Sequence, residues 1–159
     1  MPASSLVALG DRSSCALTRT GTVLCWGANE LGQLGSGATN ANANPSPITV
    51  VNIDDATSLA AGRNHTCASR KTGAVVCWGA GANGQLGDGR VHVDAGGAQP
   101  SIVAVSGLSN ASGVGGGGAH ACAPTADQSV LCWGANDRGQ LGNGTQTSST
   151  APVSVSGYP

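Results

Sequence analysis

The fold of this 159-residue chain is decided by the segment Cys77-Trp78-Gly79-Ala80-Gly81-Ala82-Asn83-Gly84-Gln85-Leu86-Gly87-Asp88-Gly89, which occurs three times in related form. The tripeptide Cys-Trp-Gly also starts at Cys25 and at Cys132, so consecutive copies lie 52 residues (25 to 77) and 55 residues (77 to 132) apart. Self-similarity at such a period is typical of a repeat architecture. The sequence therefore predicts three units, with approximate boundaries at 1–55, 56–110 and 111–159.

Other positions keep the same register in all three units. Six residues after each Trp, the tetrapeptide Gly-Gln-Leu-Gly begins at Gly32, Gly84 and Gly139. Ten residues before each Cys-Trp-Gly there is a second cysteine, at Cys15, Cys67 and Cys122, and five residues before that a glycine, at Gly10, Gly62 and Gly117. Near the end of each unit a proline introduces an apolar run, at Pro47, Pro100 and Pro152. So many matches in register exclude a chance similarity.

Each unit contains four short apolar or alternating runs, which predict four β-strands. In the second unit these runs are 58–61, 66–69, 74–78 and 102–105. Glycine at the end of 18–21 and of 70–73 suits a tight hairpin turn between the second and third strands, whereas 126–129 in the third unit lacks that glycine. Four strands and one Trp in a repeat of this length are typical of a β-propeller blade. We therefore expect an all-β chain of three propeller blades.

The second unit resembles the regulator-of-chromosome-condensation (RCC1) repeat family, on the motifs Ala61-Gly62-Arg63-Asn64-His65-Thr66, Trp78-Gly79 and Gly84-Gln85-Leu86-Gly87. The resemblance extends over nearly the whole chain. It implies a propeller, usually of seven blades, that serves as a rigid protein-binding platform. The chain departs from the family pattern at Ser13, where a histidine is usual, and at the two cysteines of each unit.

The six cysteines are predicted to form one disulfide within each unit: Cys15–Cys25, Cys67–Cys77 and Cys122–Cys132. A hairpin that places two cysteines opposite each other brings their Cα atoms within disulfide range. Each such link would contribute up to about 3 kcal/mol. A zinc site is the alternative, since His65 and His120 lie two residues before a cysteine, but Ser13 breaks that set and leaves too few ligands. We expect disulfides and no metal.

Composition and charge exclude several classes of function. The formal net charge is −1, charged residues make up 9% of the chain, and there is no basic run to bind nucleic acid or an anionic membrane surface. No apolar stretch reaches the roughly 20 residues that a membrane span needs. Paired cysteines indicate an extracellular or cell-surface protein. Because the first residues lack the features of a signal peptide, we expect the export signal to lie outside this chain.

No group of residues predicts catalysis or a cofactor site. The segment from Gly79 to Gly84 satisfies G-x-G-x-x-G, but the residues after it cannot form the helix that a dinucleotide site requires. His65, His120 and the tryptophans are equivalent between repeats. We therefore interpret the histidines as hydrogen-bonding groups between strands or blades, and the tryptophans as packing residues. The chain is predicted not to be an enzyme and to bind no cofactor.

The repeat is broken only between the glycine turn and the proline, at 38–46, 90–99 and 145–151. Loops on a rigid scaffold are where binding residues concentrate. The second of these loops holds a dense group of ionisable side chains, Arg90, His92 and Asp94. We interpret these three as a candidate partner-contact loop; a solvated loop without function is the alternative.

Three blades cannot close a ring, because propellers have about four to eight. We therefore expect either further repeats or a second copy of the chain, in which case two copies would form a six-bladed ring. The first hypothesis for function is a non-enzymatic scaffold that binds another protein. The alternative is a structural, self-assembling repeat protein of the cell envelope. Guanine-nucleotide exchange, known in the resembling family, is the least favoured, since its functional residues cannot be placed on this chain.

Overall fold

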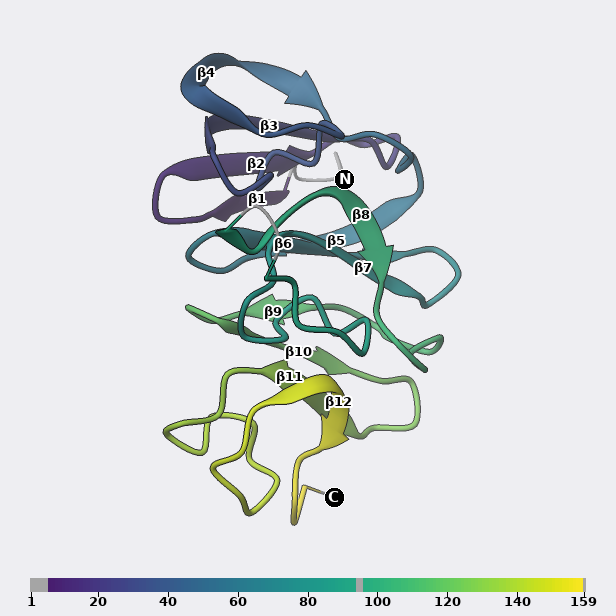
Figure 1. Ribbon diagram of the computed structural model, residues 1–159. Helices are drawn as coiled ribbons and strands as arrows, with labels where there is room; N and C mark the ends of the chain where they lie inside the picture. Colours follow the sequence, from purple (N-terminus) through teal and green to yellow (C-terminus); the bar gives the residue numbers. More distant parts are fainter. Residues whose placement is uncertain (1–5, 94–95, 159) are drawn as a thin grey trace.

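The chain forms three four-stranded antiparallel sheets (Figure 1). The computed structural model describes residues 6–93 and 96–158. The strands of the first sheet are β1 (Leu6–Leu9), β2 (Ser13–Leu17), β3 (Val23–Asn29) and β4 (Asn40–Thr49). Those of the second are β5 (Ala56–Ala61), β6 (His65–Arg70), β7 (Val75–Ala80) and β8 (Ala98–Ala104). Those of the third are β9 (Gly115–Gly116), β10 (His120–Pro124), β11 (Val130–Gly134) and β12 (Ser149–Ser154).

Within each sheet the strands follow one another in chain order, so each strand pairs with the next one along the chain. The three sheets stand one after another from the N-terminal to the C-terminal end (Figure 1). Strand β1 contacts β5, and β5 contacts β9, so the first strands of the sheets lie together along one line. This arrangement of blades around their innermost strands is a partial β-propeller, which confirms the predicted fold class.

In each blade the two cysteines are directly opposed across the second and third strands. Every expected pair is joined: Cys15–Cys25, Cys67–Cys77 and Cys122–Cys132, with Cα–Cα distances of 4.1, 4.1 and 4.0 Å. All six sulfur atoms are therefore in disulfides, and the structure contains no free cysteine among its described residues. The thiolates that the zinc alternative needs are not available.

Cysteine and tryptophan face opposite sides of each sheet because they are neighbours on one strand. In the second blade, Cys67 and Cys77 face the third blade, whereas Trp78 faces the first. Each hydrophobic core therefore lies between two blades. The first core combines the disulfide, Leu34 and Val50 of blade 1 with Trp78 of blade 2. The second core repeats this arrangement between blades 2 and 3, with Leu86 and Trp133 in the corresponding places.

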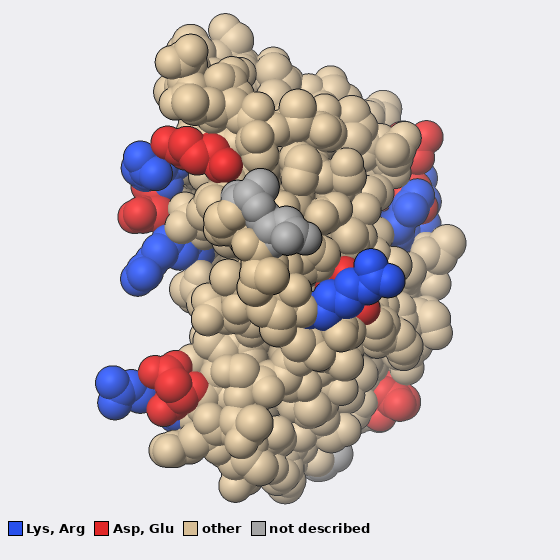
Figure 2. Space-filling view, in the orientation of Figure 1, with Lys and Arg blue, Asp and Glu red and all other residues tan. Residues whose placement is uncertain are grey.

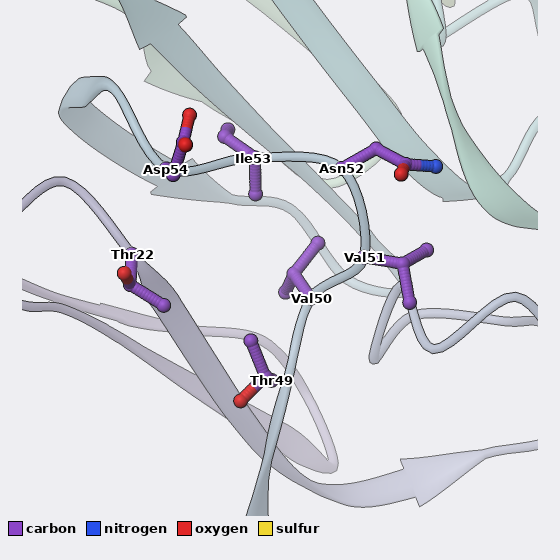
Figure 3. A pocket seen from close by; sticks show the side chains of 7 residues that line it. All are labelled: Thr22, Thr49, Val50, Val51, Asn52, Ile53 and Asp54. Atoms are coloured by element: carbon purple, nitrogen blue, oxygen red, sulfur yellow. The ribbon is translucent and has the colours of Figure 1, made fainter.

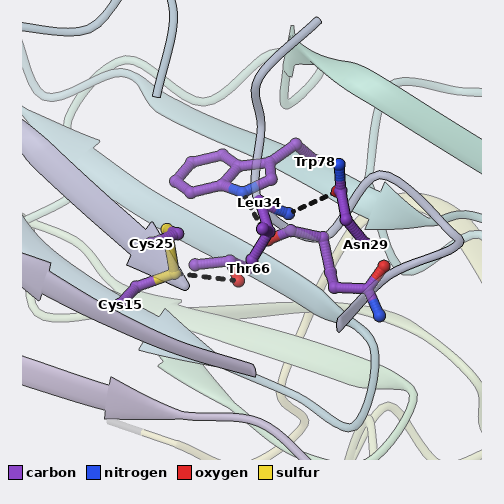
Figure 4. The surroundings of a disulfide bond; sticks show 7 residues. Cys15, Cys25, Asn29, Leu34, Thr66 and Trp78 are labelled. Carbon is purple, nitrogen blue, oxygen red and sulfur yellow. Dashed lines mark hydrogen bonds between the residues drawn. A yellow bond between two sulfur atoms is a disulfide. The ribbon is translucent and has the colours of Figure 1, made fainter. Parts of the chain in front are cut away.

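The indole of each core tryptophan is hydrogen-bonded to the preceding blade. Trp78 Nε1 donates to the main-chain oxygen of Gln33 over 3.0 Å, above the disulfide of blade 1 (Figure 4). Trp133 Nε1 donates to Gln85 O over the same distance. A Cβ atom at Gly35, which has a φ of +63°, would lie 3.0 Å from the Trp78 ring. The second glycine of Gly-Gln-Leu-Gly is therefore needed for the close approach of the tryptophan.

Three main-chain hydrogen bonds complete each contact between blades. One is donated by the later blade, from Ala56 to Gly21 O over 3.0 Å and from Ala111 to Gly73 O over 2.9 Å; the other two are donated by the earlier blade. The amide of Asp11 donates to Arg63 O over 3.0 Å near the inner strands, and the amide of Gly37 donates to Pro100 O over 3.0 Å near the outer edge. Between blades 2 and 3 the same bonds run from Arg63 to Gly118 and from Gly89 to Thr150. The two contacts between blades thus follow a single hydrogen-bonding pattern.

The outermost strand of each blade is longer than its hydrophobic pattern suggests. Strand β4 covers most of the expected loop 38–46, and β8 begins at Ala98 within the expected loop 90–99. The loop prediction was therefore wrong for most of 38–46, because an outermost strand pairs through its main chain while its side chains stay in solvent. Residues 90–93, 96–97 and 145–148 do lie outside strands, as expected. The proline register also differs. Cys25, Cys77 and Cys132 pair with Ile48, Val103 and Val153. Pro100 is therefore equivalent to Pro45 and Thr150, and not to Pro47 and Pro152.

The third blade forms its hairpin without the glycine of the other two. Gln128 has a φ of +68° where Gly21 and Gly73 have +96° and +82°. The cost of this conformation is offset by a side-chain network, in which the hydroxyls of Thr125 and Ser129 donate to the carboxylate of Asp127. These hydrogen bonds, with that from Thr125 the largest cause, lower the pKa of Asp127.

We predict that Trp78→Phe lowers the free energy of unfolding by about 2–4 kcal/mol, because it leaves the buried Gln33 carbonyl without a donor and opens a gap in the core. Denaturant unfolding under non-reducing conditions measures the change. Trp26→Phe is the matched control, since no blade covers Trp26 within the chain, and in dilute solution it should change stability little. Equal losses in the two variants would contradict this account of the core.

Candidate binding surface

On one side of the partial propeller lie the turns that follow the innermost strands and the loops that precede the outermost strands. We call it the turn face. It consists of the turns 10–12, 62–64 and 117–119 and the loops 30–39, 81–97 and 135–148. In an antiparallel meander these connections all leave from the same end of the sheets. The opposite side carries the hairpins 18–22, 71–74 and 125–129, so each face presents its own set of loops.

Two neighbouring hollows mark the turn face. The first, of ≈ 300 Å³, lies among the turns of all three blades and is lined chiefly by glycine main chain. The second, of ≈ 250 Å³, is lined by residues of the three blades that include Leu31, Asn64 and Asn83. Arg63 and Gly118 line both hollows, so the two are contiguous. Together they give the face a shallow, mainly uncharged depression.

The loop 81–97 stands beside this depression and is held by its own hydrogen bonds. The amide of Gly81 donates to Gly97 O over 2.9 Å, and the amide of His92 donates to Gly81 O over 3.2 Å. The His92 imidazole lies 3.0 Å from the carboxylate of Asp88, and both side chains are largely buried. The side chains of Val91 and Val93 point the other way and are 49% and 71% exposed. The loop therefore displays two aliphatic side chains on a tethered base.

The predicted contact residues Arg90, His92 and Asp94 are placed differently by the structure. Arg90 is exposed on the loop, whereas His92 is turned inward against Asp88. Asp94 lies outside the described residues. Sequence reasoning emphasised charge and missed Val91 and Val93. Their alternation around His92 was the available signal, because it places two apolar side chains on one side of an extended segment.

The opposite face has a larger hollow, of ≈ 680 Å³, at the connection from blade 1 to blade 2. Figure 3 shows Val50 and Ile53 beneath it, with Thr22, Thr49, Asn52 and Asp54 around them. Asp54 is the sole ionisable group of this lining. Acid–base or nucleophilic chemistry needs at least a second positioned group, so the hollow offers no constellation that supports catalysis.

Charged side chains occur in small groups of mixed sign rather than in one patch (Figure 2). Pairs such as Arg12–Glu30, at 3.5 Å, and Arg138–Asp137, at 3.4 Å, are largely exposed. Among residues 6–93 and 96–158, no three His, Cys, Asp or Glu side chains are grouped as a metal site would require. In the same part of the chain no helix is long and apolar enough to span a bilayer. The surface thus favours contacts of mixed polarity.

Comparison with protein families assigns the repeat. Two models of the regulator of chromosome condensation (RCC1) repeat match, one over residues 20–69 and 127–159 and the other over 5–33, 56–85 and 112–140. Each covers more than half of the chain. The chain belongs to the RCC1 repeat family. The resemblance read from the second unit is thereby confirmed.

Proteins of known description are similar to this chain over most of its length. The human E3 ubiquitin-protein ligase HERC2 is 35% identical over 148 residues, which is 92% of this chain but 3% of HERC2. The ultraviolet-B receptor UVR8 of Arabidopsis thaliana is 31% identical over 154 residues, or 96% of this chain and 34% of the receptor. The chain therefore spans about a third or less of the length of these relatives.

Solved structures show the same fold at lower identity. The crystal structure of Prp20p from Saccharomyces cerevisiae matches with a TM-score of 0.81 and 20% identity, over 94% of this chain and 37% of Prp20p. Human WBSCR16 matches with a TM-score of 0.78 and 22% identity, over 97% of this chain and 38% of that protein. Both comparisons show the same fold over nearly the whole of this chain.

The RCC1-repeat histidine of blade 2, His65, is buried with 2% of its surface exposed, and neither ring nitrogen has a hydrogen-bond partner among the described residues. The prediction of a hydrogen-bonding role was therefore wrong. The ring instead packs over Gly62, where a Cβ atom would lie 2.1 Å from the imidazole and 2.4 Å from Gly117 O. Burial, and secondly the charge of His120, lower the pKa of His65 from 6.5 to about 4.

This lowered pKa predicts that the fold loses stability in mild acid. The unfolded chain binds a proton at His65 below about pH 6.5, whereas the folded chain does not until about pH 4. The free energy of unfolding should therefore be highest above about pH 6.5, and it should fall by about 3 kcal/mol as the pH approaches 4. Urea unfolding across this range measures the loss. His65→Leu should remove most of the pH dependence, and His120→Gln should leave most of it; the same slope in wild type and His65→Leu would contradict the assignment.

Proposed function

We propose that this chain is a non-enzymatic protein-binding scaffold whose turn face receives the partner. The observation that carries the proposal is the loop 81–97, which presents Val91 and Val93 to solvent while its base is fixed by His92 and Asp88. Side chains next to a hydrogen-bonded base lose less conformational entropy on binding than side chains on an untethered segment. Exposed aliphatic side chains beside a depression fit the apolar centre of an interface, with polar groups around it.

The chemistry of the loop suggests the chemistry of the partner. Val91 and Val93 would enter an apolar depression on the partner, and exposed Arg90 beside them would meet an acceptor, best a carboxylate. The depression around Arg63 and Gly118 would receive a small projecting element of the partner. A folded protein or an ordered peptide with an apolar and acidic surface meets these conditions.

Structural relatives support a binding role at the level of the fold. Prp20p was described together with its binding properties to Gsp1p and histones, and yeast RCC1 (Prp20) was solved with Kap60 bound. The chain covers 37% and 36% of those proteins, so their partners are not transferred to it. What the proposal takes from them is only that an RCC1 propeller can present its surface to other proteins.

We further propose that the protein works outside the reducing cytosol, on the cell surface or in the extracellular space. Its support is chemical: all six cysteines are paired within blades, and such disulfides persist in oxidising compartments. A structural, self-assembling role is a second candidate. The observation that favours it is the repeated contact between blades, whose pattern a further blade could continue.

The double substitution Val91→Ser/Val93→Ser is expected to abolish partner capture without affecting the fold, because both side chains are exposed. The disulfide-bonded protein is immobilised, incubated with an extract of the source organism, and bound proteins are quantified by mass spectrometry. The amount of a specific partner captured by the variant should be at least about tenfold lower than with the wild type, which is the effect of losing a small apolar anchor. Arg19→Ala/Lys71→Ala, on the opposite face, is the control. Unchanged capture by the loop variant would refute the proposed site.

The proposed location predicts that the cysteines are oxidised in the source cells. Free thiols are blocked with an alkylating reagent at lysis, the disulfides are then reduced and labelled with a second reagent, and peptides are mapped. All six cysteines should carry the second label, in three pairs within blades. Uniform labelling by the first reagent would show a reducing compartment and overturn the proposal on location, while leaving the binding proposal untouched.

A further inference from the structure

The contact between blades 2 and 3 encloses a histidine that the contact between blades 1 and 2 lacks. Side chains alternate along β6, so His65 faces blade 3 together with Cys67. The ring lies over Gly62 of its own blade, and Gly117 O of blade 3 borders the same space. The imidazole is therefore enclosed between the main chains of two blades.

Ser13 occupies the equivalent place in the contact between blades 1 and 2. The register places Ser13 in β2 as it places His65 in β6, each opposite the glycine of Cys-Trp-Gly. A Cβ atom on Gly10 would lie 2.9 Å from Ser13 Oγ and 3.0 Å from Gly62 O of the next blade, which repeats the surroundings of His65. Ser13 is buried as well. The two contacts thus share one construction, and at this place only the second holds a group that titrates.

No carboxylate lies near His65 to balance a charge on its ring. The elements packed against it are its sheet neighbours β5 and β7 and, from blade 3, β9 and β10. These four strands contain no Asp, Glu, Lys or Arg, and their one titratable side chain is His120. The adjoining turns, 62–64 and 117–119, add only the exposed Arg63. A cation at His65 would therefore have positive groups nearby and nothing to pair with.

Protonation of the enclosed ring would be costly because its nitrogens make no hydrogen bond to the described residues. The neutral ring has one donor and one acceptor, whereas the protonated ring has two donors and a charge. Burial of an unpaired charge costs far more than burial of an unpaired polar group. When the two blades separate, water reaches the ring and this cost is removed. Protonation of His65 therefore favours the open contact.

Both contacts are closed by the same set of hydrogen bonds. The donors between blades 2 and 3 are the amides of Arg63, Gly89 and Ala111 and the indole of Trp133. Their counterparts between blades 1 and 2 are the amides of Asp11, Gly37 and Ala56 and the indole of Trp78. Opening of either contact exposes its own donors, so the two contacts can be compared within one molecule.

We propose that protonation of His65 opens the contact between blades 2 and 3 in mild acid, while the contact between blades 1 and 2 stays closed. The opening would separate Arg63 from Gly118, which are joined across this contact over 3.0 Å and line both hollows of the turn face. The depression of that face is therefore intact only while the contact is closed. Both blades of this contact lie within the described chain, and the inference is independent of the binding role of loop 81–97.

The pKa of His65 gives the direction and size of the effect. In the closed contact it is about 4, lowered from 6.5 by burial and secondly by the charge of His120, and water restores the ordinary value when the contact opens. Between these two values the open contact binds the extra proton. Opening should therefore increase about tenfold for each pH unit of acidification, whereas above about pH 6.5 it should not depend on pH.

Hydrogen exchange of the tryptophan indoles, followed by nuclear magnetic resonance, tests the proposal on the disulfide-bonded chain. Trp133 reports the contact between blades 2 and 3, and Trp78 reports the contact between blades 1 and 2. Each rate is divided by that of a tryptophan peptide at the same pH. Between about pH 7 and about pH 5 the protection of Trp133 should fall about twentyfold, and that of Trp78 should stay the same. Equal losses at both indoles, or no loss at Trp133, would overturn the proposal.

Exchange of the two equivalent residues tests the role of His65 itself. His65→Ser gives the second contact the residue of the first, and the acid response of Trp133 should disappear. Ser13→His does the reverse, with Gly10 leaving space for the ring, and Trp78 should acquire the response. His92→Ser is the matched control, because this histidine lies in loop 81–97 and should leave the wild-type pattern.

A Trp133 response that persists in His65→Ser would refute the assignment, as would its loss in His92→Ser. Circular dichroism shows whether each variant is folded. If Ser13→His does not fold, the comparison of His65→Ser with the wild type decides the question.

Discussion

The structure depends on one hydrogen bond that crosses between blades, from a tryptophan indole to the main-chain oxygen of the glutamine in Gly-Gln-Leu-Gly. It requires a glycine at Gly35 and at Gly87, because a Cβ atom there would meet the indole. In blade 1 the loop that carries this carbonyl is held by Asn29, whose side-chain oxygen accepts a hydrogen bond from the amide of Leu34; blade 2 has Gly81 at the equivalent position. The tryptophan of Cys-Trp-Gly and the Gly-Gln-Leu-Gly segment of the preceding unit are therefore parts of a single contact.

This contact explains how a chain with three tryptophans, one tyrosine and no phenylalanine can build a core. Side chains alternate along a strand, so each disulfide faces the following blade and each core tryptophan faces the preceding one. Each core between two described blades therefore contains one disulfide and one tryptophan. In repeat proteins of this kind, stability is close to a sum of units and nearest-neighbour contacts. Each further repeat then adds one contact of the same kind.

Much of the fold was predictable from the amino-acid sequence. The period, the four strands of each unit and the cysteine pairing follow from spacing, because opposed positions in a hairpin are fixed by the length between them. The side-chain orientation of His65 was not predictable: its motif suggests a hydrogen bond, but the ring is enclosed by glycine main chain of its own and the next blade. Of the candidate site, Arg90 was found and His92 proved to be turned inward. Val91 and Val93 were overlooked because the prediction relied on charged side chains and not on the apolar residues that alternate with His92.

Spacing within about 50 residues of chain was enough to give the number of units, their all-β character, the family and the cysteine pairing. That the cores lie between blades, with the disulfide of one blade under the tryptophan of the next, emerged only from the folded arrangement. These features depend on contacts between units, and the pattern within one repeat does not record which side of its sheet meets a neighbour.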